Sequence, residues 1–386
     1  MSKPHCTLAI AIPLVLGLAS MAAAETFTLK ADGTGDYPNI QAAITAADDG
    51  DVIQLENGTY MGPGNRDISF QGKAIKLCSI SNSPDYCIID CEGSQAEPHR
   101  GFKFESGEGS GSQLQGISII GGYTSGSWPE DAGGGIYCRN STAPSIENCI
   151  LFSNRSGNGA GICCDGGSSP ALIDCVIRGN PAAFYGGGIY CYDDSSPYFE
   201  RCKITRNRAG YYGGGMRSAN SSPTFVQCTF SLNSAVYGGA GLAFSGETSA
   251  EIYRCTVAEN RTSGDGGGIY CYHSSPELEN TLITKNDSEG IYIYGSATPL
   301  LEACDMHGNE RGDWEGALAD QLNRSYNICA DPEFCLDQDE DSYFLQSDSP
   351  CADAPNPGSE GIGAWEVGCQ DFTAEEITWS ELKGLH

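Results

Sequence analysis

Apolar and small side chains recur along this chain with a long and nearly constant period. Segments of the form Gly-Gly-Gly or Gly-Ala-Gly, each followed by an apolar residue, begin at positions 133, 159, 186, 213, 239 and 266. Successive segments are therefore 26 or 27 residues apart. Regular spacing of this kind is the signature of a repeat protein, in which each repeat contributes one structural unit.

A second marker recurs in phase with the glycines. One position of each repeat holds Cys149, Cys175, Cys202, Cys228, Cys255, Thr281 and Cys304. The residues three before and two after this position are always apolar, and the residue five after it is always Asn. The Asn column consists of Asn154, Asn180, Asn207, Asn233, Asn260, Asn286 and Asn309. Asn side chains stacked in one column can form a ladder of amide hydrogen bonds.

These repeats predict an all-β fold, a right-handed parallel β-helix. Each repeat supplies three short runs with one apolar face, for example residues 135–138, 145–148 and 150–153. Such runs cannot bury their apolar faces alone, but coils stacked about 4.8 Å apart pair as parallel strands and share one core. Glycines and period-two alternation argue against helical repeats. A propeller blade would need four strands in about 40 residues, which is more than one repeat holds.

The two ends of the repeat array are expected to be capped. We expect one domain at residues 25–369, with regular coils at 133–309, a C-terminal cap at 323–369 and an exposed tail at 370–386. Residues 39–47 carry Ile40, Ala43, Ile44 and Ala47 at the spacing of a short amphipathic helix. An open solenoid end would expose its core and a strand edge, so we place this helix over the first coil.

Residues 1–24 are predicted to be a signal peptide. Lys3 precedes an apolar run at residues 8–18, and Ala22 to Ala24 offer a small-residue cleavage site. The run is shorter than the roughly 20 apolar residues that span a bilayer, and no other segment is long enough, so we expect no transmembrane segment. The chain is therefore expected to be secreted or held at the cell surface.

The charge of the chain limits its partners. Lys and Arg number 21 against 50 Asp and Glu, which gives a formal net charge of −29. An acidic surface repels phosphate backbones, so we expect no nucleic-acid partner. An acidic polysaccharide would need a local basic patch or a bound cation. We expect a monomer that contacts a polysaccharide or another cell-surface ligand.

Several segments resemble a known group of proteins. The glycine-rich segments and the run Phe230-Ser231-Leu232-Asn233 resemble the repeats of chlamydial-type polymorphic membrane proteins. More broadly, the chain resembles exported bacterial proteins of the pectin-lyase-like, right-handed β-helix group. Residues 37–44 and 50–53 look like the usual opening of that group, and residues 331–335 and 347–351 look like its usual close. The resemblance implies a fold but no particular function, because proteins that share a fold need not share a functional site.

The chain contains 19 Cys residues, an unusually large number. Those of the repeat column are expected to be buried thiols, which fill a core well. Disulfides between neighbouring coils are the alternative, since the coil spacing lies within the allowed Cα range. Disulfides are expected in the cap, where less core holds the chain, among Cys329, Cys335, Cys351 and Cys369. The lack of a Cys-x-x-Cys pair and the five His residues argue against zinc.

Paired carboxylates are the weak candidates for catalysis or metal binding. Asp193 and Asp194 follow a glycine-rich strand and resemble the Asp pair of polygalacturonase-like hydrolases, although the Gly-His-Gly motif of those enzymes is missing. A solvated turn is the alternative. Ca²⁺ is the only cofactor for which we find candidate ligands, and these are Glu147, Glu200, Asp337, Asp339 and Asp341. A polar outer face explains these acids equally well.

Tyrosines cluster around the glycine-rich segments. They either precede the glycines or follow them: Tyr185, Tyr212, Tyr237, Tyr190, Tyr192, Tyr270 and Tyr272. Rows of exposed rings would suit sugars, because the apolar faces stack while the hydroxyl groups reach polar neighbours. The alternative is that Tyr packs on Tyr and stiffens the edge of the coils.

Two classes of function follow from these patterns. The first is a secreted or cell-surface, adhesin-like binding scaffold whose long face contacts a polysaccharide. The sequence does not distinguish such a scaffold from a purely structural coat protein. The second is a polysaccharide lyase or glycoside hydrolase. Such enzymes usually build a cleft from long loops, and the longest irregular excursion here is residues 121–132, with Trp128. We therefore favour the binding scaffold.

Overall fold

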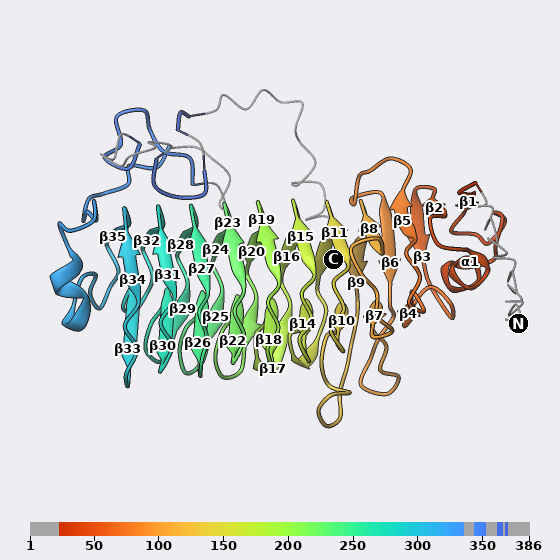
Figure 1. Cartoon of the computed structure of the whole chain (residues 1–386), viewed down its shortest axis with the longest axis horizontal. Helices are drawn as coiled ribbons and strands as arrows, with labels where there is room; N and C mark the ends of the chain where they lie inside the picture. The colour runs from red at the N-terminus through yellow and green to blue at the C-terminus, as the bar shows by residue number, and fades with distance from the viewer. Residues whose placement is uncertain (1–22, 336–342, 353–360, 366, 370–386) are drawn as a thin grey trace, which may run out of the picture.

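The chain folds into a right-handed parallel β-helix, whose coils stack along one long axis (Figure 1). The computed structural model describes residues 23–335, 343–352, 361–365 and 367–369. The predicted signal peptide, apart from residues 23 and 24, and the predicted tail at 370–386 lie outside the described residues. None of the described helices is both long and apolar enough to cross a membrane.

Three long parallel sheets form the sides of the solenoid, as the repeats predicted. The eleven-stranded sheet contains β1 (Thr26–Leu29), β2 (Val52–Leu55), β5 (Lys76–Ser79), β8 (Gln113–Gln115), β11 (Ser145–Glu147), β15 (Ala171–Ile173), β19 (Tyr198–Glu200), β23 (Thr224–Val226), β27 (Glu251–Tyr253), β31 (Glu277–Glu279) and β34 (Leu300–Glu302). The ten-stranded sheet contains β3 (Gly58–Tyr60), β6 (Cys87–Asp90), β9 (Ser118–Ile120), β12 (Ile150–Phe152), β16 (Val176–Arg178), β20 (Lys203–Thr205), β24 (Thr229–Ser231), β28 (Thr256–Ala258), β32 (Leu282–Thr284) and β35 (Asp305–His307). The nine-stranded sheet contains β4 (Ile68–Ser69), β7 (Phe102–Phe104), β10 (Ile136–Cys138), β14 (Ile162–Cys164), β18 (Ile189–Tyr192), β22 (Met216–Ala219), β26 (Leu242–Ser245), β30 (Ile269–Tyr272) and β33 (Ile291–Tyr294).

A fourth, short sheet adds a side that the sequence did not predict. It contains β13 (Ser156–Asn158), β17 (Pro181–Tyr185), β21 (Arg208–Ala209), β25 (Ser234–Ala235) and β29 (Arg261–Thr262). These strands lie between the Asn column and the glycine-rich segment of each repeat. Most of them pair through only two residues, which is too short a run for alternating hydrophobicity to be recognised.

The predicted Asn ladder is present and buried. Asn207 is representative: its Nδ2 donates to the carbonyl of Ile177 at 2.8 Å and to Oδ1 of Asn233 at 3.1 Å. Its own Oδ1 accepts from the backbone N–H and from Nδ2 of Asn180, both at 3.0 Å. The ladder therefore satisfies backbone groups at a turn where no strand partner is available.

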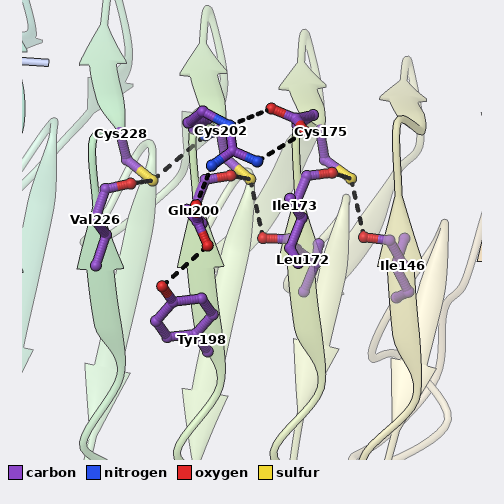
Figure 2. Close-up of polar contacts among 11 residues, drawn as sticks. Ile146, Leu172, Ile173, Cys175, Tyr198, Glu200, Cys202, Val226 and Cys228 are labelled. Carbon is purple, nitrogen blue, oxygen red and sulfur yellow. Dashed lines mark hydrogen bonds and ion pairs between the residues drawn. The ribbon is translucent and has the colours of Figure 1, made fainter. Parts of the chain in front are cut away.

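The cysteine column consists of buried free thiols, as predicted, and not of disulfides between coils (Figure 2). Cys175 Sγ donates to the carbonyl of Ile146, one coil earlier, at 3.4 Å, and also to that of Ile173 at 3.3 Å. Each thiol is thus a small apolar side chain with a weak donor that bonds a carbonyl.

The cap contains one disulfide among the described residues, between Cys335 and Cys369. The expectation of disulfides at Cys329 and Cys351 was wrong, because both are free. Cys351 is buried and its Sγ donates to Oδ2 of Asp305 at 3.1 Å, while Cys329 is exposed beside His307.

Both ends of the core are covered (Figure 1). At the N-terminal end, α1 (Ile40–Ala46) buries Ile40, Ala43 and Ile44, close to the residues predicted to be helical. At the other end, the 3-10 helix η1 (Gly316–Gln321) packs on the core through Leu318, next to Trp314.

The rest of the cap returns along the outer face of the ten-stranded sheet. The Trp365 ring N–H donates to the Thr229 hydroxyl at 2.9 Å, and the Ala364 N–H donates to the Thr256 hydroxyl at 3.0 Å. Ile362 packs in a small apolar cluster with Leu282. The cap therefore covers part of one side of the solenoid as well as its end.

Candidate functional site

Aromatic side chains gather on the outer side of the nine-stranded sheet. Within each strand the residues that alternate with them, such as Ile189 and Cys191, point into the core and are fully buried. One outward row runs Tyr190, Arg217, Ala243, Tyr270, Tyr292, and the next runs Tyr192, Ala219, Ser245, Tyr272, Tyr294. Parallel pairing in register thus places equivalent repeat positions side by side.

Rings on and beside the short fourth sheet join these two rows. Tyr212 contacts Tyr270 at 5.3 Å between ring centroids, and Tyr185 contacts Tyr190 at 6.0 Å. We call the combined surface the aromatic face, and it consists of Trp128, Phe184, Tyr185, Tyr190, Tyr192, Tyr211, Tyr212, Tyr237, Tyr270, Tyr272, Tyr292 and Tyr294. Trp128, from the irregular excursion at 121–132, packs edge-on against Tyr190 and Tyr192.

The rings of the aromatic face do two things at once. Many stack on the next coil, as Tyr272 does on Tyr294 with centroids 5.4 Å apart, and this packing stiffens the surface. Yet Tyr192, Tyr272 and Tyr294 remain 37%, 42% and 50% exposed, whereas Tyr190 is only 8% exposed. Several exposed rings gathered on one face are uncommon on a soluble protein and typically mark a binding surface.

Arg217 lies in the middle of the aromatic face. Its guanidinium carbon is 5.0 Å from the ring centroid of Tyr185 and 5.3 Å from that of Tyr212. One terminal nitrogen donates to the Ser245 hydroxyl at 2.9 Å, while Nε has no hydrogen-bond partner. Within the described part of the chain no carboxylate forms an ion pair with Arg217. Burial lowers the pKa of this group from its usual value.

A partly buried cation without an acidic partner is notable in a chain of net charge −29. The surrounding rings stabilise it through their negative faces. Guanidinium groups bind hydroxyl and carboxylate oxygens, which a ligand on this face would present.

The structure places the predicted acidic candidates in ordinary surface surroundings. Asp193 and Asp194 are exposed in a left-handed turn, with φ of 55° and 60°. The Asp193 carbonyl accepts from the Gly167 N–H, and the Asp194 N–H donates to the Asn220 carbonyl, both at 2.8 Å. These contacts involve the backbone, so they describe a turn and give the two carboxylates no catalytic partner.

The two candidate Ca²⁺ ligands that the structure describes are not brought together. Glu147 and Glu200 lie two coils apart, separated by Ile173. Glu147 accepts from the Ser145 hydroxyl at 3.1 Å, while Glu200 forms an ion pair with Arg201 and accepts from the Tyr198 hydroxyl (Figure 2). A carboxylate already paired with Arg attracts a cation less strongly. The other candidates, Asp337, Asp339 and Asp341, lie outside the described residues.

A shallow depression of about 370 Å³ adjoins the aromatic face, on the fourth sheet. Arg208 and Arg261 line it together with Ser234, Val236 and the acidic Asp287, and Val236 precedes the exposed Tyr237. Cationic side chains therefore continue from the aromatic face onto the neighbouring sheet.

Sequence reasoning missed several members of this surface. Arg217 occupies the same repeat position as Tyr190 and Tyr270, so counting from each triple-Gly segment would have found it. Tyr292 and Tyr294 follow a segment that lacks the triple Gly, which concealed their equivalence. No sequence signal places Trp128 near Tyr192.

Comparisons with known proteins agree with this architecture. The family model described as "Right handed beta helix region" matches residues 41–212, 103–277 and 160–328. The crystal structure of pectate lyase Pel9A superposes with a TM-score of 0.59 at 13% identity, covering 90% of this chain and 98% of that one. The pectin methylesterase from Aspergillus niger, in deglycosylated form, gives a TM-score of 0.42 at 16% identity, with 79% and 90% covered. No curated protein matches the sequence.

The family model and the pectate lyase structure establish the fold and leave the activity open. At 13% identity the likeness to the pectate lyase shows the fold alone, because unrelated functions share this architecture. The expected pectin-lyase-like fold is therefore confirmed, while the resemblance to exported proteins of that group and to polymorphic membrane proteins stays a prediction.

Proposed function

Because the chain belongs to the right-handed β-helix family, which supplies a long regular surface, we propose that it is an exported protein that binds polysaccharide along its aromatic face. The observation that carries this proposal is the second row of the nine-stranded sheet, which lies beside Arg217 and has exposed rings towards both ends. Tyr192 lies at one end of the second row and Tyr272 and Tyr294 at the other, with Ala219 and Ser245 between them.

The dimensions of the rows suit a sugar chain. Tyr192 and Tyr272 lie three coils apart, which is about 14 Å at the usual strand spacing. A chain of a few sugar residues spans that distance and can stack on a ring at each end. The small side chains between the rings leave its middle free to reach the Arg217 guanidinium and the Ser245 hydroxyl.

Charge supports a particular way of binding. The overall net charge of −29 disfavours any anionic polymer at long range. Arg217, Arg208 and Arg261 offset this repulsion locally, at and beside the aromatic face. Ring stacking therefore supplies the attraction common to all sugars, and the arginines decide how well carboxylate-bearing chains are accepted.

The test is a retention assay with neutral and uronate-containing polysaccharides, using purified residues 25–386. Binding and the release of reducing or unsaturated ends are scored in the same samples, with and without Ca²⁺. Retention without new ends supports a binding scaffold. Release of ends would show a lyase or hydrolase instead, and no retention on any polymer would contradict the proposal.

A further inference from the structure

We propose that His307, Asp313 and Cys329 form a binding site for a divalent transition-metal ion of the Zn²⁺ type at the C-terminal end of the solenoid. This inference is independent of polysaccharide binding, because the site lies on β35 and the cap and not on the aromatic face. Each residue offers one ligand atom, and the three atoms all lie within 4.8 Å of one another.

The three ligands come from three separate segments. His307 is the last residue of β35, Asp313 lies in the following turn, and Cys329 follows Ile328, which forms a bridge with Asp305 at the start of β35. His307 Nδ1 and Cys329 Sγ are 3.9 Å apart. Sequence motifs with short spacing could not reveal such a set, which explains why the sequence argued against zinc.

Hydrogen bonds hold each ligand segment in place before any ion binds. The Ile328 N–H donates to the Cys304 carbonyl at 2.9 Å, and the Trp314 ring N–H donates to the Ile328 carbonyl at 3.0 Å. The second contact ties the residue after Asp313 to the residue before Cys329. Outer contacts of this kind orient metal ligands.

Asp313 is fixed even more firmly. Its Oδ1 accepts from the backbone N–H and from Nδ2 of Asn309, at 3.0 and 2.7 Å, and its Oδ2 accepts from the Gly308 N–H at 3.1 Å. Asp313 thus ends the Asn ladder by taking the place of the next Asn. An Asn would serve that structural purpose without a charge, whereas the carboxylate adds an anionic oxygen next to His307 and Cys329.

The donor set suits an ion of borderline softness. Imidazole nitrogen, thiolate sulfur and carboxylate oxygen bind Zn²⁺ at about 2.0–2.3 Å, so tetrahedral ligands lie about 3.3–3.8 Å apart. The three ligand atoms lie within 4.8 Å of one another. Each pair would therefore have to approach by about 1 Å or less to reach the upper end of the tetrahedral range. Cys329 is exposed, so a fourth position is open to water.

The experiment titrates the full chain with CoCl₂ in the absence of other metals and measures absorption and Trp fluorescence. Binding at Cys329 predicts a thiolate-to-cobalt charge-transfer band and quenching of Trp314, saturating at one equivalent and displaced by ZnCl₂. Cys329→Ser should abolish the band, and His307→Gln should weaken Co²⁺ binding by roughly tenfold or more. His99→Gln is the matched control, because His99 pairs with Asp67 at 2.6 Å far from the site.

The outcomes separate clearly. A charge-transfer band lost in Cys329→Ser, with unchanged titration of His99→Gln, supports the site. Circular dichroism of each variant confirms that it remains folded, and Cys329→Ala provides a second surface substitution. Absence of the band in the unaltered chain, or a Co²⁺ affinity that is equal in the unaltered chain, Cys329→Ser and His307→Gln, would overturn the proposal.

Discussion

The Arg217 guanidinium carbon lies 5.0 Å from the ring centroid of Tyr185, within the range of a cation–π contact. This pair joins the nine-stranded sheet to the short fourth sheet, so that two sides of the solenoid present one continuous surface. The Arg217 guanidinium in this pair is a cation that no carboxylate of the described residues neutralises.

Replacing Arg217 with Met tests the contribution of this cation to binding. Met keeps an apolar stem against the rings but removes the charge and the donors. We expect the affinity for a uronate polymer to fall by about ten- to a hundredfold, since a charge-assisted hydrogen bond contributes about 1.5–3 kcal/mol. Isothermal titration with neutral and uronate polymers measures the effect, with Arg324→Met as a control that removes an exposed Arg. An equal loss for both polymers would contradict a role for the charge.

The Asn ladder should dominate local stability. Asn207→Ala removes four hydrogen bonds and leaves buried backbone groups of neighbouring coils unsatisfied. We expect the free energy of unfolding to fall by about 2–5 kcal/mol, measured by urea denaturation. Asn57→Ala, which removes an exposed side chain, should change it by less than about 0.5 kcal/mol. Similar effects for the two variants would argue against the ladder as a stabilising element.

The thiols should differ sharply in reactivity. Burial raises the pKa of Cys149, Cys271 and Cys304 to about 12, and a thiol that stays protonated and covered reacts slowly. Cys329 is the exposed free cysteine among the described residues. Iodoacetamide at pH 8, followed by peptide mass spectrometry, should therefore modify Cys329 first in the native protein and these buried cysteines only after denaturation. Rapid native labelling of Cys304 would show that the column is open to solvent.

Asp165 should make stability depend on pH. Burial raises the pKa of this carboxyl, which accepts from the Tyr137 hydroxyl at 3.0 Å. Below the ordinary Asp pKa of about 3.9, Asp165 is protonated in both the folded and the unfolded protein. Above that pKa the unfolded protein ionises first. The stability contributed by protonated Asp165 is therefore lost as the pH rises through its raised pKa in the folded protein.

Asp165→Asn cannot ionise, so its free energy of unfolding relative to the unaltered protein should increase from pH 3.5 to pH 7. Urea denaturation at both values measures this difference. Asp194→Asn, which alters an exposed turn residue, should show no such trend. A relative stability of Asp165→Asn that is the same at both pH values would refute the prediction.

The sequence predicts the long-range order of this fold well, because the determining features are periodic. Gly, Cys and Asn each recur at one repeat position, and stacking converts those positions into the columns seen at Cys175 and Asn207. The fourth sheet escaped prediction because strands such as Arg208–Ala209 are too short to carry a pattern.

The candidate site was only partly predictable. Tyr192 and Tyr272 were identified because they follow triple-Gly segments, but their exposure depends on the small residues of the intervening coils. The cluster at His307 depends on how the cap returns to β35. That path is set by single contacts, such as the one between Trp314 and Ile328, and single contacts leave no repeating signal.

The most direct test of polysaccharide binding compares two double variants that each remove two exposed tyrosines. Tyr192→Ala with Tyr272→Ala alters the aromatic face, whereas Tyr86→Ala with Tyr253→Ala removes rings of comparable exposure elsewhere. If each ring contributes about 1 kcal/mol, the first pair should weaken binding of a retained polysaccharide by about tenfold or more. The second pair should leave it unchanged. Equal affinity for both double variants would contradict the assignment of the aromatic face as the binding surface.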